Sequence, residues 1–189
     1  RIPCLVKNGF KGNIFCTSAT RDLCAVMLMD SAFIQEKDVE FVNRLRKKNG
    51  QRLFEPLYNR GDTAKAMNHF VGLSYDRSHQ LFPGINLTLV DAGHMLGSAH
   101  VILEIDDQDS GLRRRLVFSG DIGRPDIPII RDPVPLKDGA DILIMESTYG
   151  NRLSPAYPES EKELKRIVNE TVSRGGSLLI PAVTTPRRL

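Results

Sequence analysis

The sequence predicts a mixed fold of the α/β or α+β class, in which helices flank a group of adjacent strands. Apolar and polar residues alternate over 85–89 and again over 101–105, which is the period of half-buried strands. Residues 141–145 form a nearly continuous apolar run, which is typical of a strand buried on both faces. With 189 residues and 41% hydrophobic content, the chain can form one core, or one domain and the start of another.

The N-terminal third predicts a strand followed by helices. Residues 13–17 have the pattern of a short strand, and residues 21–34 carry apolar side chains near one helix face. A second, more polar helix is expected over 36–48. It should stop at Asn49 and Gly50, because these residues favour the left-handed backbone that ends helices.

The middle of the chain predicts one more helix and then a hairpin. Residues 62–72 are expected to be helical, because the apolar residues up to Phe70 and Val71 have helical spacing. Residues 106–111 are polar and predict a hairpin loop, with 115–119 as the returning strand.

The last element is the most regular helix pattern. Ser160 and Glu163 have the spacing of a capping box, and Gly175 follows the last periodic residue as a stop. The apolar stripe of this helix comprises Leu164, Ile167, Val168, Thr171 and Val172. Residues 177–180 then predict the start of another strand.

The net charge, the cysteines and the lengths of the apolar runs limit the kinds of partner and the cellular location that we expect. The net charge of +3 and the pI near 8.8 are mildly basic, which is compatible with a nucleic-acid partner without arguing for one. The odd set of Cys4, Cys16 and Cys24 lacks close metal-type pairs and predicts reduced thiols. No apolar run has the length of about 20 residues that a membrane helix needs. We therefore expect a cytoplasmic protein with no membrane partner.

Three ionisable residues each follow an apolar, strand-like run at a polar turn. His94 lies between Gly93 and Gly97, Asp121 follows Gly120, and Glu146 follows the run over 141–145. Strand ends let a rigid sheet present side chains to a cleft, and histidine and carboxylate are zinc ligands in hydrolases. Three such ends in one chain predict a shared site.

Each residue also has a purely structural interpretation. His94 could be a histidine hydrogen-bonded within its turn, and Asp121 could cap a turn through its own carboxylate. Glu146 could form an ion pair with Arg152. His69, His79 and His100 match no ligand position: His69 lies near the apolar face of a helix, His79 in a loop, and His100 at the start of a strand.

At these residues the chain resembles the metallo-β-lactamase superfamily, and more specifically its β-CASP branch of RNA- and DNA-processing nucleases. The resemblance is carried by three motifs: Asp-Ala-Gly-His-Met-Leu-Gly-Ser-Ala over 91–99, Phe-Ser-Gly-Asp-Ile-Gly-Arg over 118–124, and Met-Glu-Ser-Thr-Tyr-Gly-Asn-Arg over 145–152. The third motif is the most specific one. Residues 1–12, 20–36 and 55–58 are similar to that branch too, so the resemblance covers nearly the whole chain.

The resemblance implies a role for each residue. His94 corresponds to a zinc-ligand histidine, Asp121 to the aspartate that bridges two zinc ions, and Glu146 to an acidic residue that helps proton transfer to the leaving group. The implied reaction is phosphodiester hydrolysis by a metal-activated hydroxide. RNA is the expected substrate rather than DNA, because most of the branch processes RNA.

The resemblance also implies missing parts. The His-X-His-X-Asp-His zinc motif of the family would lie just before Arg1, and its later histidine motifs beyond Leu189. We therefore expect residues 1–152 to form a partial αββα sandwich lacking its N-terminal strands, and 153–189 to lead into a truncated β-CASP domain. Residues 183–187 depart from the family pattern, because a proline replaces a glycine.

An incomplete zinc site predicts that the parent protein is the ribonuclease and that this chain alone is inactive. Open strand edges predict aggregation, a homo-oligomer or marginal stability. Two other functions stay open: a non-catalytic RNA-binding or scaffold subunit of the same family, and a hydrolase of a small ester or thioester. The motif over 145–152 counts against the latter.

Overall fold

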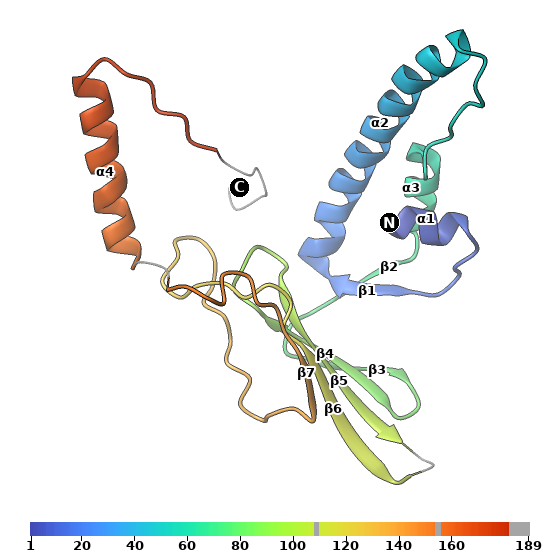
Figure 1. Cartoon of the computed structure of the whole chain (residues 1–189). Helices are drawn as coiled ribbons and strands as arrows, with labels where there is room; N and C mark the ends of the chain where they lie inside the picture. Colours follow the sequence, from blue (N-terminus) through green and yellow to red (C-terminus); the bar gives the residue numbers. More distant parts are fainter. Residues whose placement is uncertain (108–109, 154–155, 182–189) are drawn as a thin grey trace. The chain divides into compact units, whose positions relative to one another are not determined.

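The computed structural model describes residues 1–107, 110–153 and 156–181. It divides the chain into two compact units, Arg1–Tyr75 and Asp76–Leu189 (Figure 1). Each unit contains both helix and strand, so the mixed class predicted from the sequence is confirmed. The domain boundary expected at residue 152 stays a prediction.

The first unit consists of three helices and a two-stranded parallel sheet (Figure 1). Its elements are α1 (Ile2–Lys7), β1 (Ile14–Thr17), α2 (Ser18–Lys48), α3 (Arg60–Met67) and β2 (Phe70–Leu73). The strand predicted over 13–17 is therefore confirmed as β1, and it pairs with β2 in register from Ile14 with Phe70.

The two helices predicted over 21–34 and 36–48 are one helix, α2, of 31 residues. The prediction was wrong because nothing at the junction breaks a helix: Gln35 has good helix propensity. The Gln35 amide also donates hydrogen bonds to the backbone oxygen of Ser31 at 3.2 Å and to its hydroxyl at 3.3 Å. The predicted stop is confirmed, since Asn49 caps the helix and Gly50 has a φ of +61°.

The helix predicted over 62–72 is also wrong in its second half. The helix α3 begins with a capping box between Asn59 and Asp62 and ends at Met67, and Phe70–Leu73 form β2 instead. A short apolar run fits a buried helix face and a buried strand equally well. The segment forms a strand because it pairs with β1, and Phe70 is buried there.

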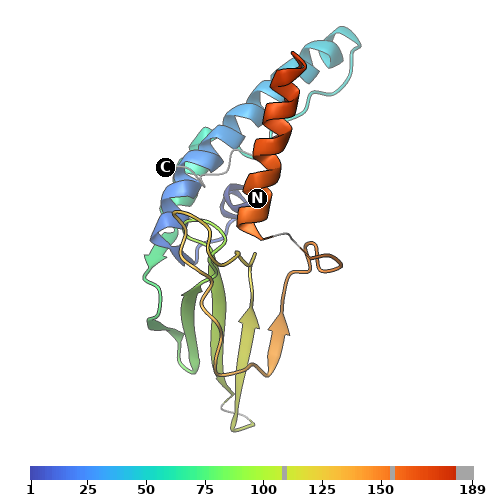
Figure 2. The same ribbon diagram turned by 90° about the vertical axis from the view of Figure 1, so that its left-hand side faces the viewer.

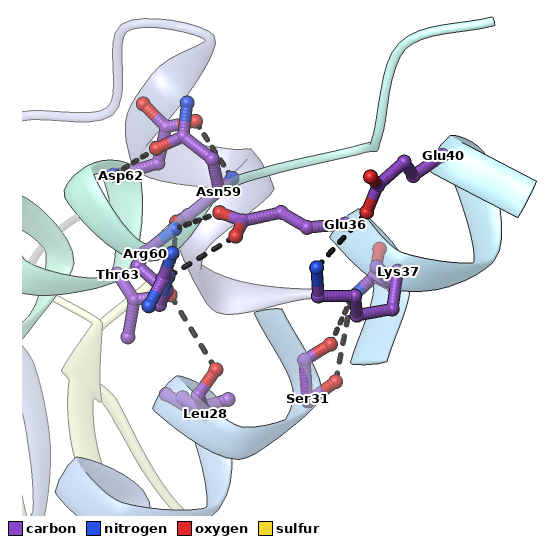
Figure 3. Close-up of polar contacts among 10 residues, drawn as sticks. Leu28, Ser31, Glu36, Lys37, Glu40, Asn59, Arg60, Asp62 and Thr63 are labelled. Atoms are coloured by element: carbon purple, nitrogen blue, oxygen red, sulfur yellow. Dashed lines mark hydrogen bonds and ion pairs between the residues drawn. The ribbon is translucent and has the colours of Figure 1, made fainter. Parts of the chain in front are cut away.

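Side-chain contacts fix α3 against α2 (Figure 3). The Glu36 carboxylate accepts hydrogen bonds from the Arg60 backbone N–H at 2.9 Å and from its Nε at 3.1 Å. The fully buried Thr63 donates its hydroxyl to the Leu28 carbonyl at 3.5 Å.

The second unit is built on a five-stranded sheet in the order β3-β4-β5-β6-β7 (Figure 2). Its strands are β3 (Ser78–Phe82), β4 (Ile85–Asp91), β5 (Ala99–Asp107), β6 (Leu112–Phe118) and β7 (Ile142–Ile144). Neighbours are antiparallel except β6 and β7, which are parallel. The predicted strands and hairpin are confirmed, although β6 begins at Leu112 because it pairs there with Asp107.

Two expectations about this sheet are wrong. His79 lies in β3 rather than in a loop. The apolar run over 141–145 is not buried on both faces, because the three residues of β7 are 51–54% exposed. Within the described residues, β7 pairs with β6 alone and forms the sheet edge. The buried cluster lies in the middle strands instead, where Val90, Ile102 and Val117 pack together with Leu136 against them.

The C-terminal helix is confirmed as α4 (Tyr157–Ser173). Its predicted capping box is wrong: the cap is Ala156, and Ser160 lies inside the first turn with its hydroxyl donating to the Ala156 carbonyl at 3.2 Å. A proline in the first turn starts the helix, because its fixed φ suits that position. The strand expected over 177–180 is absent from the described structure. The unusual residues 183–187 lie outside the described residues.

Two smaller expectations can be compared with the structure. All three cysteines are free thiols, as predicted. Among the described residues, no helix combines the length and the hydropathy needed to cross a membrane.

Candidate metal and catalytic site

The sheet topology brings the three predicted site residues to one edge. His94 follows β4, Asp121 follows β6, and Glu146 follows β7. Because β5 is antiparallel to both β4 and β6, and β7 is parallel to β6, these three strands run in the same direction. Their C-terminal ends therefore lie along the same edge of the sheet.

Local hydrogen bonds shape the His94 turn. Gly93 has a φ of +63°, which favours glycine, and its N–H donates to the Asp91 carboxylate at 2.9 Å. The Ser98 hydroxyl accepts from the backbone N–H groups of His94 and Met95 at 3.1 and 3.2 Å. The imidazole is thus presented by a turn whose backbone groups are held in place.

The Asp121 turn packs backbone against backbone on the His94 turn. The Gly123 N–H donates to the Ala92 carbonyl at 2.8 Å. A Cβ at Gly123 would lie 1.6 Å from the carbonyl oxygen of Gly93, and a Cβ at Gly93 would lie 2.4 Å from the nitrogen of Pro133. Only glycine at position 123 permits the two turns to approach this closely, and glycine at position 93 leaves room for Pro133.

His94 and Asp121 face each other across this contact. The Nε2 atom of His94 lies 3.8 Å from the Oδ2 atom of Asp121, with the side chains 28% and 71% exposed. Zinc holds imidazole nitrogen and carboxylate oxygen at about 2.0–2.2 Å, so two donors at this separation can reach one ion. This donor pair fits a partial zinc site.

Glu146 is fixed beside them in its ionised form. Its Oε1 atom accepts a hydrogen bond from the Ile122 N–H at 2.5 Å. That bond is the main reason why the pKa of Glu146 is lowered; a hydrogen bond from the Thr148 side chain and the nearby His94 act in the same direction. Glu146 is therefore a carboxylate at neutral pH, next to the turn that carries Asp121.

Arg152 does not hold Glu146 as an ion pair in the described structure. Its guanidinium instead lies 3.9 Å from the centroid of the Tyr149 ring. Tyr149 has a φ of 56°, a left-handed backbone that is uncommon outside glycine.

Sequence reasoning missed the contribution of Ser119. This buried hydroxyl accepts from the Glu146 N–H at 3.1 Å and donates to the Gly120 carbonyl at 2.6 Å. Its own carbonyl lies 2.6 Å from Nδ1 of the buried His100. Ser119 thus ties the ends of β6 and β7 to β5. The sequence feature that could have indicated this role is a small polar residue directly after an apolar strand and directly before a glycine.

The strand ends enclose a pocket of about 370 Å³. His94 and Glu146 line it together with Thr148, Tyr149 and two arginines, Arg124 and Arg152. The sequence did not indicate that Arg124 belongs to the site. A pocket that combines carboxylate, imidazole and guanidinium groups can bind an anionic substrate next to a cation.

The other histidines lie elsewhere. His69 Nδ1 is 2.9 Å from the Gly12 carbonyl, and His79 Nε2 is buried with no hydrogen-bond partner among the residues that the structure describes. Over residues 1–107, 110–153 and 156–181, no three His, Cys, Asp or Glu side chains are grouped so as to hold a metal ion. His94 and Asp121 therefore supply two donors, whereas tight zinc sites use three or four.

No protein-family model matches this chain. It is similar over nearly its whole length to curated proteins, including the "Transcription termination factor FttA" of Methanosarcina mazei, 32% identical over 98% of this chain and 27% of the relative. The protein of the same name from Methanocaldococcus jannaschii is 35% identical over 95% of this chain and 26% of its own length. "Ribonuclease TTHA0252" of Thermus thermophilus is 30% identical over 99% of this chain and 37% of its own length. The chain thus spans between a quarter and two fifths of these relatives.

Proposed function

We propose that this chain is part of a zinc-dependent phosphodiester hydrolase that cleaves RNA, a β-CASP nuclease of the metallo-β-lactamase superfamily. The observation that carries the proposal is the 3.8 Å approach of His94 to Asp121 beside the ionised Glu146. The similarity to relatives named as a ribonuclease and as termination factors supports RNA as the substrate.

In this proposal His94 and Asp121 bind zinc, and the remaining ligands come from parts of the complete protein outside this chain. Bound zinc supplies a hydroxide at neutral pH by lowering the pKa of its water to about 7. Because Glu146 is ionised, it would first accept the proton released by the attacking water and then pass it to the oxygen of the leaving group; its hydrogen bond from Ile122 keeps it oriented. Arg124 and Arg152 line the pocket as cations for the phosphates flanking the cleaved bond.

The chain alone supplies only two zinc ligands, and this determines how it should behave in isolation. It should bind zinc weakly and cleave RNA poorly until the other ligands are present. The complete protein is therefore the one to test.

A second candidate function has one observation in its favour. Because the described residues group no three metal donors together, the parent could be a non-catalytic RNA-binding or scaffold subunit of the same family. In that protein the pocket would bind RNA without cleaving it.

The deciding experiment replaces Asp121 with alanine in the complete protein. We expect RNA cleavage to fall by more than about 100-fold, since even losing a residue that only supports a metal ligand lowers activity by about 10- to 100-fold. Zinc content, measured by atomic emission, should fall as well. Asp106→Ala is the matched control, because it removes an exposed carboxylate from the same sheet, one paired with Arg113 at 3.6 Å.

Unchanged turnover in Asp121→Ala would remove this residue from the mechanism. RNA binding with neither zinc nor cleavage in the unmodified protein would favour the non-catalytic subunit.

A further inference from the structure

Positive charge is concentrated at the end of α2. Between Arg44 and Glu55 the chain carries five basic side chains and one acidic one, whereas the rest of the chain has 21 basic and 22 acidic residues. This short segment thus accounts for more than the whole net charge of +3. Clustering of this kind is the electrostatic signature of a polyanion-binding surface.

The segment that follows α2 folds back onto the helix end. The Asn43 amide donates to the Phe54 carbonyl and accepts from the Phe54 N–H, both at 2.8 Å. Arg46 Nε donates to the Arg52 carbonyl at 2.6 Å. These three bonds hold residues 52–54 against the last turns of α2, so the surface is formed before any ligand arrives.

An aromatic ring lies within this basic surface. The Arg46 guanidinium is 4.0 Å from the centroid of the Phe54 ring, which is cation–π geometry. Phe54 nevertheless stays 52% exposed, and a hollow of about 390 Å³ is lined by Arg46, Arg52 and Phe54, together with Leu53 and Glu55.

Three further cations of this segment have no partner of opposite charge among the described residues. Arg44 pairs with Glu40 at 3.2 Å. In the part of the chain that the structure describes, Lys47, Lys48 and Arg52 form no ion pair, and all three are exposed. We name Arg46, Lys47, Lys48, Arg52 and Phe54 the basic patch.

We propose that the basic patch binds single-stranded RNA outside the cleavage pocket. Lys47, Lys48 and Arg52 bind backbone phosphates, and Phe54 contacts a base. Single strands suit this surface because phosphates need mobile cations and unstacked bases need an exposed aromatic side chain. The choice of RNA rests on the proposed function, but the site lies in Arg1–Tyr75 and uses none of the catalytic residues.

The test measures binding and cleavage separately in the complete protein. Fluorescence anisotropy with an unstructured 20-nucleotide RNA, at several salt concentrations, compares the unmodified protein with Lys47→Gln/Lys48→Gln. We expect binding at least about 10-fold weaker and a salt slope reduced by about 1.4, because each phosphate contact on a single strand contributes about 0.7. Zinc content should be unchanged. Lys162→Gln/Lys165→Gln is the matched control, since it removes two exposed lysines from α4.

Phe54→Leu tests the aromatic contact. It retains an apolar side chain, so we expect about 5- to 100-fold weaker binding from the lost stacking, with the salt slope unchanged. Zinc content should be unchanged in this variant as well.

Equal RNA binding by the patch variant and the α4 control would overturn the proposal. So would a patch variant that binds RNA normally but fails to bind an acidic protein. A protein that never cleaves RNA but loses RNA binding on Lys47→Gln/Lys48→Gln would refute the nuclease and leave the patch intact, so the two proposals fail separately.

Discussion

The pocket lined by His94 and Glu146 and the basic patch are built by different kinds of contact. In the pocket, the turns of His94 and Asp121 meet backbone to backbone, at Gly93 and Gly123. In the basic patch, the side chains of Asn43 and Arg46 hold a segment that has no regular structure. The pocket should therefore be sensitive to any added atom at a glycine, whereas the patch should tolerate substitutions and respond mainly to lost charge.

The largest expected loss of stability comes from adding a side-chain atom where the backbones of the two turns meet. Gly123→Ala would place a Cβ 1.6 Å from the Gly93 carbonyl oxygen, so one of the two turns must move. We expect the second unit to lose about 3 kcal/mol or more of its free energy of unfolding, measured by chemical denaturation.

Gly139→Ala is the control for this substitution. Gly139 has a φ of +67° but an added Cβ would meet no atom within 4 Å. Only the backbone strain remains, of about 1–2 kcal/mol. Equal losses for the two variants would show that the contact between the turns does not determine stability.

A smaller loss of stability is expected when the hydrogen bonds of Ser119, which join the ends of β6 and β7, are removed. Ser119→Ala removes the acceptor of the Glu146 N–H and the donor to Gly120. Because this N–H is only partly buried, leaving it unsatisfied should lower stability by about 1 kcal/mol, the lower end of the range for buried groups. Ser110→Ala, which removes an exposed hydroxyl on the hairpin, should change stability by less than about 0.5 kcal/mol in the same denaturation experiment.

The smallest effect concerns pH and the helix that carries the basic patch. Hydrogen bonds from Lys37 and Arg44 lower the pKa of Glu40 below its ordinary value of 4.5. A lowered pKa means that the unfolded chain takes up the proton first. The stabilisation is therefore present above pH 4.5 and is lost as the pH falls through the folded pKa.

Glu40→Gln should remove this dependence. The protection factors of the α2 amides, which correct for the intrinsic slowing of exchange at low pH, should then fall less on acidification than in the unmodified protein. Glu161→Gln on α4 serves as the control, because Glu161 forms no ion pair in the described structure. An identical acid response of the Glu40→Gln and unmodified proteins would contradict the assignment.

The sequence indicated two residues that line the pocket, His94 and Glu146, but it gave no indication of the basic patch. The difference has a physical cause. His94, Asp121 and Glu146 each follow a strand closely, and strands that run in the same direction bring such ends to one edge of the sheet. The glycines that allow the two turns to come close together are also visible in the sequence, beside the site residues. By contrast, the contact between Arg46 and Phe54 depends on how a loop folds back, and no period or motif encodes it.

The errors in the fold have the same origin. Gln35 fits a continuous helix as well as a junction, so spacing alone could not join the two halves of α2. The run at Phe70 and Val71 fits a helix and a strand until β1 pairs with it. The exposure of β7 depends on what lies beside the strand, which its own apolar residues do not specify.

Anomalous diffraction at the zinc absorption edge from crystals of the complete protein would locate the metal relative to His94 and Asp121. We expect a peak about 2.0–2.2 Å from His94 Nε2 and from a carboxylate oxygen of Asp121. Zinc bound elsewhere in the protein, with no peak between these two side chains, would contradict it.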